Sequence, residues 1–239
     1  MKNNILITIC ARGGSKGLKN KNIKPLNNIP LIIYSINLAI EFSKIYKSDI
    51  AISSDSKEIL KIASKNGLST EYIRPKILCG DNVGKIETIE HLLFHEENYR
   101  NKKYDIILDL DVSSPLRNLN DLILAYKKLI NNKEALNLFS VNNSSKNPYF
   151  NMVEIGENDY VHLVKKGKFL TRQSAPRVYE LNASFYFYKR LFFELKNKYV
   201  ITKKSIMYEI THICFDIDNQ IDFEFMNYLV KNNKLNFKF

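Results

Sequence analysis

The chain has 239 residues, of which 45% are hydrophobic, and carries a formal net charge of +11. This length suits one domain, 1–239, with an arm inserted at 147–180. The lysines are scattered along the chain, so the charge does not favour a nucleic-acid partner. No apolar stretch reaches the roughly 18 residues of a membrane helix, and three separated cysteines suit a reducing compartment. We therefore expect a cytoplasmic protein that does not bind nucleic acid or membranes.

Strand-like and helix-like patterns alternate for most of the chain. Apolar runs predict strands at 5–10, 49–53, near Tyr72, and at 104–110, 136–141 and 184–188. Helical spacing predicts helices at 30–46, 55–66, 85–98, 119–130, 189–196 and 222–231. Between 147 and 180 the pattern breaks into short aromatic and polar pieces, which we interpret as an inserted β-rich arm. The alternation predicts an α/β fold with a mostly parallel sheet and helices on both faces.

The first predicted strand opens into a glycine loop with the sequence ARGGSKGLKNKN. The adjacent Gly13 and Gly14 let backbone N–H groups approach a ligand, while Arg12, Lys16 and Lys21 bring positive charge. Neither the Walker A spacing nor the dinucleotide-binding spacing is present. The loop favours a polyanion, with a nucleoside triphosphate as the best fit; the alternative is a surface turn with solvated lysines.

Acidic residues alternate at the ends of two predicted strands. The two pairs are Asp109 with Asp111, and Asp216 with Asp218. In an extended chain this spacing puts both carboxylates of a pair on one face, where their oxygens suit Mg²⁺. One acid of the second pair has the alternative role of capping the last helix. Either acid of the first pair is a candidate metal ligand, and we favour Asp111 because it is nearer the strand end.

The loop and the acids support one another chemically. A triphosphate in a partly dry cleft needs both cationic side chains and a divalent ion. In an attack on the α-phosphorus, the metal neutralises developing charge, while Arg12 and Lys21 stabilise the departing diphosphate. No histidine base is required, because none of the four histidines shows a convincing pairing with a serine or cysteine nucleophile.

These residues together resemble the acylneuraminate cytidylyltransferases, also called CMP-sialic acid synthetases. The matching segments run in family order across nearly the whole chain: Ala11-Arg12-Gly13-Gly14-Ser15-Lys16-Gly17 with Lys21-Asn22, Ser53-Ser54-Asp55, Arg74-Pro75, Ser114-Pro115-Leu116-Arg117, Arg172-Gln173, Asn182-Ala183 and Asp216-Ile217-Asp218. The N-terminal motif is the most specific of them. The resemblance implies a Rossmann-like nucleotidyltransferase fold that uses Mg²⁺ to convert CTP and a nonulosonic acid, a nine-carbon 2-keto sugar acid, to the CMP-sugar and diphosphate.

The resemblance also implies a role for each matching residue. The nucleotide-binding set is Ala11, Arg12, Gly13, Gly14, Ser15, Lys16, Lys21, Asn22 and Arg74, and the catalytic set is Arg12, Lys21 and Asp218. The candidate metal ligands are Asp111, Asp216 and Asp218, and the sugar-binding candidates are Asp111, Arg172, Gln173 and Asn182. Members of the family are homodimers in which an arm reaches over the partner's cleft.

One motif departs from the family pattern. Many sialic acid enzymes have Gln-Pro-Thr before Ser-Pro-Leu-Arg, whereas this chain has Asp111-Val112-Ser113. Because the glutamine is associated with the sugar, an acceptor of the legionaminic or pseudaminic type is as admissible as N-acetylneuraminate. The competing functions are a cytidylyltransferase for an eight-carbon 3-deoxy sugar acid of lipopolysaccharide and a non-catalytic nucleotide sensor. The glycine pair disfavours the first, and the retained acids disfavour the second.

Overall fold

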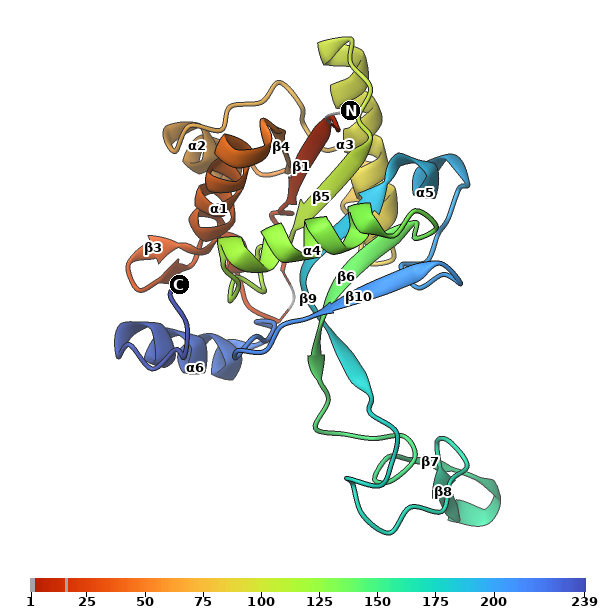
Figure 1. Cartoon of the computed structure of the whole chain (residues 1–239). Helices are drawn as coiled ribbons and strands as arrows, with labels where there is room; N and C mark the ends of the chain where they lie inside the picture. Colours follow the sequence, from red (N-terminus) through yellow and green to blue (C-terminus); the bar gives the residue numbers. More distant parts are fainter. Residues whose placement is uncertain (1–2, 16) are drawn as a thin grey trace.

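The computed structural model describes residues 3–15 and 17–239, so the predicted phosphate contact of Lys16 lies outside the described residues. Its centre is a six-stranded sheet in the order β10-β6-β9-β5-β1-β4 (Figure 1). The strands are β1 (Ile5–Cys10), β4 (Asp49–Ser53), β5 (Ile106–Leu110), β6 (Asn137–Asn143), β9 (Tyr179–Lys189) and β10 (Ser205–Glu209). All neighbours pair in parallel except β9, which is antiparallel to β5 and β6. The predicted, mostly parallel sheet is confirmed.

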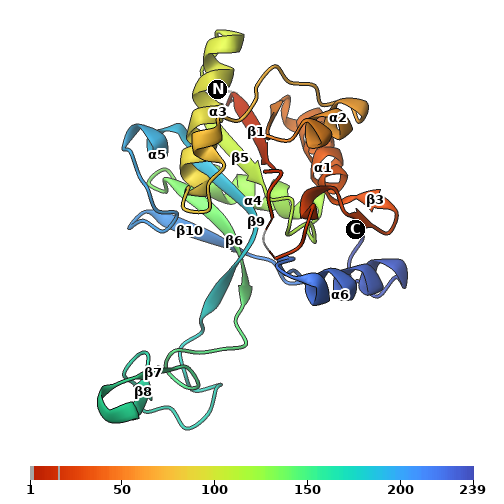
Figure 2. The same ribbon diagram turned by 180° about the vertical axis from the view of Figure 1, so that it is seen from behind.

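Helices cover both faces of the sheet, as the alternating pattern predicts (Figures 1 and 2). On one face, α1 (Leu31–Tyr46), α2 (Lys57–Lys65), α4 (Leu119–Asn131) and α6 (Gln220–Lys231) share a core with Ile7 and Ile9 of β1. On the other, α3 (Lys85–Arg100) and α5 (Arg190–Glu194) share a core with Leu6. Successive residues of β1 thus serve opposite cores, as the period of a strand requires.

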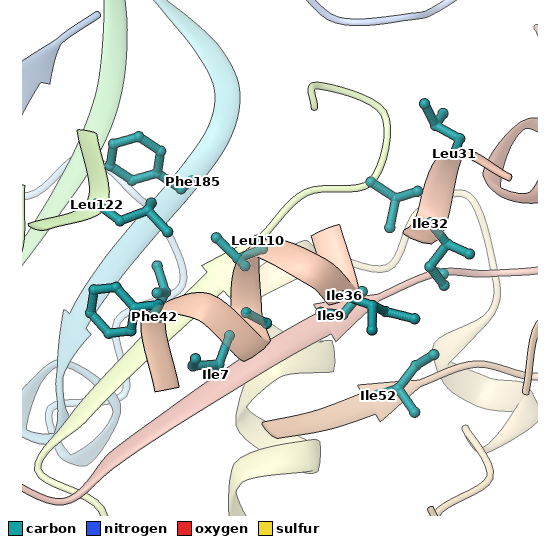
Figure 3. Packing of buried hydrophobic residues seen from close by; sticks show 14 of the residues in the cluster. Ile7, Ile9, Leu31, Ile32, Ile36, Phe42, Ile52, Leu110, Leu122 and Phe185 are labelled. Carbon is teal, nitrogen blue, oxygen red and sulfur yellow. The ribbon is translucent and has the colours of Figure 1, made fainter. Parts of the chain in front are cut away.

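The larger core is built around α1 (Figure 3). Ile32, Ile36 and Phe42 of this helix are fully buried, and so is Ile9 of β1. The four-residue spacing places Ile32 and Ile36 on the same side of the helix. Each such side chain contributes about 1.5–3 kcal/mol when it leaves water. This packing fixes β1, and with it the loop that follows.

Several local predictions are confirmed and others are wrong. The helix after β4 begins at the predicted cap, where Ser56 Oγ accepts from Ile59 N, and Gly67 follows its end with φ 84°. The strand expected near Tyr72 is absent: in the described segment the backbone-to-backbone hydrogen bond to the end of β4 is a single one, from Arg74 N to Ser54 O, which is not a strand ladder. Sequence patterns missed β10 and the small hairpin of β2 (Pro25–Leu26) and β3 (Ile29–Pro30).

An arm projects from the sheet between β6 and β9, over the range where a β-rich insertion is predicted (Figure 1). Its base is the pairing of Asn143 with Tyr179, and its tip carries the hairpin of β7 (Val153–Ile155) and β8 (Val161–Leu163). Short 3-10 helices complete the described elements: η1 (Lys21–Ile23), η2 (Lys76–Leu78) and η3 (Glu157–Asp159). Within the described ranges, no helix has the length and apolar content to cross a membrane.

The order of the strands decides where a ligand can bind. From β1 the chain passes through α1 to β4 on one side and later, through α3, to β5 on the other. A crevice opens at such a switch point, beyond the carboxyl ends of the strands. The glycine loop follows β1, and Asp111 follows β5, so both predicted clusters lie at this crevice.

Candidate active site

A cleft of about 380 Å³ lies at the switch point, and its lining includes seven of the predicted site residues. Its lining is formed by Cys10, Arg12, Ser15, Gly17, Lys21, Asn22, Arg74, Leu78, Gly80, Asp81, Val83, Lys85, Thr88, Asp111, Ser113 and Asp218. The glycine loop, the β5 end and the segment before α6 therefore meet in space. Leu78, Lys85 and Thr88 also line the cleft but were not predicted, because no sequence motif marks them.

The glycine loop lies directly against the Asp216–Asp218 segment. A Cβ atom added at Gly17 would stand 2.0 Å from the carbonyl oxygen of Asp218, so only glycine permits this approach. Lys21 Nζ donates to the carbonyl oxygen of Ile217 at 2.5 Å and lies 3.8 Å from Asp218 Oδ1. Cation loop and acidic segment thus share one wall of the cleft.

Backbone and side-chain bonds hold the first half of the loop in place. Gly13 N donates to Asp55 Oδ1 at 2.8 Å, and Asn22 Nδ2 donates to the carbonyl oxygen of Arg12 at 2.9 Å. The Arg12 guanidinium forms an ion pair with Asp81 at 2.8 Å. Ala11 is fully buried behind the loop. The loop is therefore shaped by contacts within its own chain, and its guanidinium is engaged by Asp81.

Arg74 also lines the cleft. Its Nε donates to Ser53 Oγ and its Nη2 to the carbonyl oxygen of Ser53, each at 2.9 Å, and its residue is only 6% exposed. The Ser53-Ser54-Asp55 segment at the end of β4 thus holds Arg74 through Ser53 and Gly13 through Asp55. A planar donor group held this rigidly can read the edge of a base.

At the end of β5, Asp109 and Asp111 share one ammonium. Lys85 Nζ lies 2.8 Å from Asp109 Oδ2 and 2.5 Å from Asp111 Oδ2. Asp111 Oδ1 accepts from the backbone N and the Oγ of Ser113, both at 2.8 Å. Burial favours a higher pKa for Asp111, but Lys85 and Ser113 outweigh it and lower the pKa to about 2. Asp111 is therefore an anion held on both oxygens.

The acids before α6 differ from that pair. Asp216 Oδ1 is buried without a hydrogen-bond partner, and burial, together with the charge of Asp111, raises the pKa of Asp216. Asp218 is exposed at the cleft wall. The capping alternative is wrong for both, because Asn219 and Asp222 form the capping box of α6. An unpaired buried carboxylate oxygen is what a hard cation would satisfy.

The Asp216–Asp218 pair suits a magnesium ion that takes the rest of its oxygen ligands from outside the chain. Among residues 3–15 and 17–239 there is no group of three or more acidic, histidine or cysteine side chains placed to hold a metal. Mg²⁺ commonly takes only one or two carboxylates and completes its shell with phosphate oxygens and water. Asp216 and Asp218, next to the cationic loop, match that mode.

The remaining sugar-binding candidates lie outside the cleft of their own chain. Arg172 and Gln173 line a separate hollow of about 270 Å³ at the base of the arm. Arg172 Nη2 donates there to the carbonyl oxygen of Ser145. Asn182 is buried in a polar network, where its Oδ1 accepts from Ser140 Oγ at 2.6 Å. The described lining of the cleft contains no histidine.

Comparisons with known proteins agree with this geometry. The sequence model of the cytidylyltransferase family matches residues 6–237. The chain is 42% identical over 237 residues to post-translational flagellin modification protein B of Campylobacter coli, covering 98% of each chain. It is 40% identical over 234 residues to CMP-N,N'-diacetyllegionaminic acid synthase of Campylobacter jejuni, covering 97% of each.

A solved structure shows the same fold at low sequence identity. CMP:2-keto-3-deoxy-manno-octonic acid synthetase complexed with CTP superposes with a TM-score of 0.68 at 13% identity, covering 96% of this chain and 99% of that one. This likeness concerns the architecture, and the family match carries the chemistry. The chain is an enzyme that belongs to the cytidylyltransferase family.

Proposed function

We propose that this enzyme transfers CMP from CTP to the anomeric hydroxyl of a nonulosonic acid of the legionaminic type, releasing diphosphate. The observation that carries the proposal is the contact between the glycine loop and the Asp216–Asp218 segment, made through Gly17 and Lys21. The acceptor class rests on the relative that is named for a CMP-legionaminic acid and is 40% identical over 97% of the chain.

The cleft supplies each part of the nucleotide with a partner. Arg12 and Lys21 bind the phosphates and stabilise the leaving diphosphate, since both are cations on the loop wall. Asn22 and Arg74 also line the cleft and recognise the cytidine. The ordering of these side chains by Ser53 and by the loop backbone reduces the reorganisation needed when CTP binds.

Asp216 and Asp218 hold Mg²⁺ in this proposal. When bound, the ion neutralises charge on the α-phosphate and lowers the pKa of the attacking hydroxyl. Lys21 links the glycine loop to these acids, because its ammonium donates to the carbonyl oxygen of Ile217, which lies between them in the sequence. Removal of the divalent ion with a chelator therefore abolishes diphosphate release.

The binding site for the sugar acid is completed by a partner subunit. We propose a homodimer in which the arm reaches the partner's cleft, where Arg172 and Gln173 contact the carboxylate of the sugar acid. Support comes from their position on the arm side of the molecule, away from the cleft of their own chain. The guanidinium fork of an arginine suits a carboxylate. The enzyme works in the cytoplasm, in keeping with Cys10, Cys79 and Cys214 being free thiols.

A substrate panel tests the proposal. The enzyme is incubated with Mg²⁺, with each of CTP, UTP, ATP and GTP, and with legionaminic, pseudaminic, N-acetylneuraminic or eight-carbon 3-deoxy sugar acids. We expect diphosphate release and a CMP-conjugate, identified by mass, to be fastest with CTP and N,N'-diacetyllegionaminic acid. Consumption of another nucleotide without any CMP-conjugate would overturn the assignment, and a preference for the eight-carbon acid would replace the acceptor class.

A further inference from the structure

Lys85 occupies an unusual place in the cleft. It is the first residue of α3, where the helix dipole is positive and an ammonium is disfavoured. Its Nζ is nevertheless enclosed by Asp109 and Asp111 and lies 4.7 Å from the centroid of the Tyr186 ring. The start of a helix disfavours this ammonium, so its contacts with the two carboxylates account for its position.

Asp109 holds the Lys85 ammonium from the interior of the sheet. It is fully buried in β5, where Thr8 Oγ1 donates to its Oδ1 at 2.9 Å. Its Oδ2 meets the Lys85 ammonium outside hydrogen-bond geometry, so that contact is ionic. The ammonium is thereby pinned between a buried carboxylate and Asp111, which borders the open cleft.

The bonds of Asp111 leave it one free acceptor position. A carboxylate oxygen accepts two hydrogen bonds; Oδ1 already accepts two from Ser113, and Oδ2 accepts one from Lys85. A metal ion on the remaining position of Oδ2 would share that oxygen with an ammonium, and the two cations would repel each other at short range. A hydroxyl or amide N–H has no such conflict.

We propose that Lys85 is a positioning and specificity-determining residue that keeps Asp111 out of the metal shell and presents its carboxylate to a hydrogen-bond donor of the sugar acid. This inference rests on the proposed function and deepens it. Asp111 then selects acceptors that place a hydroxyl or acetamido N–H at this point of the cleft. The metal is left to Asp216, which has a buried oxygen without a hydrogen-bond partner, and to Asp218.

The first experiment compares Asp111→Asn with Asp216→Asn. Binding of Mn²⁺ in the presence of CTP is measured by electron paramagnetic resonance, which counts the free ion without requiring turnover. We expect the Mn²⁺ dissociation constant to change less than about twofold in Asp111→Asn and to rise tenfold or more in Asp216→Asn. Equal weakening in both variants would make Asp111 a metal ligand and overturn the inference.

The second experiment separates the two substrates kinetically. In Asp111→Asn we expect KM for N,N'-diacetyllegionaminic acid to rise about tenfold to a hundredfold, as for a lost hydrogen bond to a charged group, with KM for CTP nearly unchanged. The preference for this acid over N-acetylneuraminic acid should change by a similar factor. Equal changes in both KM values would contradict a role directed at the acceptor.

The third experiment tests whether Lys85 acts through Asp111. Lys85→Met alone strands the buried Asp109, so the matched variant is Lys85→Met with Asp109→Asn, whose melting temperature is checked first. It should raise KM for the acid about as much as Asp111→Asn does, and add less than about threefold in the Asp111→Asn background. Additive effects, or an unchanged KM, would refute the coupling.

These outcomes are distinguishable from failure of the proposed function. If the wild-type enzyme releases no diphosphate with any sugar acid, the acceptor assignment fails. The Mn²⁺ comparison then still decides whether Asp111 belongs to the metal shell, because it requires only CTP and the ion.

Discussion

The cleft and the arm are built in opposite ways. In the cleft, Asp109 is fully buried and Arg74 is 6% exposed, and both are held by their own chain. At the arm, Ile155 is 77% exposed, Tyr160 76% and Leu170 96%. The cleft therefore has its geometry before any partner arrives, whereas the arm presents apolar side chains with nothing of its own chain to cover them. Exposed apolar patches of this kind mark interaction surfaces.

The largest effect is expected where the two halves of the cleft touch. Lys21→Ala removes the ammonium that faces both the loop and the acidic segment. Loss of a preorganised charge that stabilises the transition state costs about a hundredfold to a thousandfold in kcat. Steady-state diphosphate release measures it, with the exposed Lys19→Ala as a control for net charge. Equal loss in both variants would show that general charge, and not this contact, matters.

Gly17→Ala tests the closeness of the same two segments. The added Cβ would meet the carbonyl oxygen of Asp218 at 2.0 Å, so the loop and the acids must move apart. A displacement of about 1 Å at a reacting centre costs about a hundredfold in kcat/KM. Gly84→Ala is the matched control, because Gly84 lies outside the glycine loop and a Cβ there has no atom within 4 Å. Activity retained by Gly17→Ala would mean that the loop and the acidic segment need not touch.

A charge at the tip of the arm addresses the other region. Ile155→Asp places a carboxylate on the β7–β8 hairpin, where the side chain is exposed in the single chain. We expect the dimer dissociation constant to rise tenfold or more, while the free energy of unfolding of the subunit changes by about 0.5 kcal/mol or less. Light scattering after size exclusion measures the assembly. Ile45→Asp, an exposed site on α1, should leave it intact.

The smallest effect is expected at His212, away from both regions. Burial favours a lower pKa, but the hydrogen bonds of its ring to Asp121 and to the Ile213 carbonyl outweigh it and raise the pKa above 6.5. A raised folded-state pKa adds stability that is complete below pH 6.5 and lost as the pH rises through the folded value.

Thermal unfolding of wild type and His212→Gln between pH 6 and pH 9 isolates this term. The stability advantage of the wild type should shrink as the pH rises, with little change in activity at pH 7. An advantage that grows with pH would show that the imidazole is neutral in the folded protein.

Sequence patterns predicted the helices and strands that have regularly spaced apolar residues, and the site residues that belong to a contiguous motif. Arg12, Lys21 and Asn22 reach the cleft as predicted, because one loop carries them after a strand whose apolar run is unmistakable. The direction of β9 was outside the reach of periodicity, since parallel and antiparallel strands share the same alternation.

Lys85 shows why part of the site was missed. In the sequence it is one lysine at the start of a helix, with no acid three or four residues further along that helix to suggest a partner. Its partners Asp109 and Asp111 lie more than twenty residues away and meet it only when α3 packs on the sheet. The prediction of a metal ligand at Asp111 was made without knowledge of this lysine, whose contacts distinguish the Asp109–Asp111 pair from the Asp216–Asp218 pair in the folded protein.

Strand β9 has a consequence for how far such enzymes can diverge. It runs for 11 residues, roughly 35 Å, from the foot of the arm at Tyr179 to Lys189, and pairs Tyr186 with Asp109 on the way. A residue inserted at the hairpin tip lengthens a loop in solvent. A residue inserted in β9 before Tyr186 would turn that ring away from Lys85 to the opposite side of the sheet. Length variation among relatives should therefore concentrate at the tip and spare this strand.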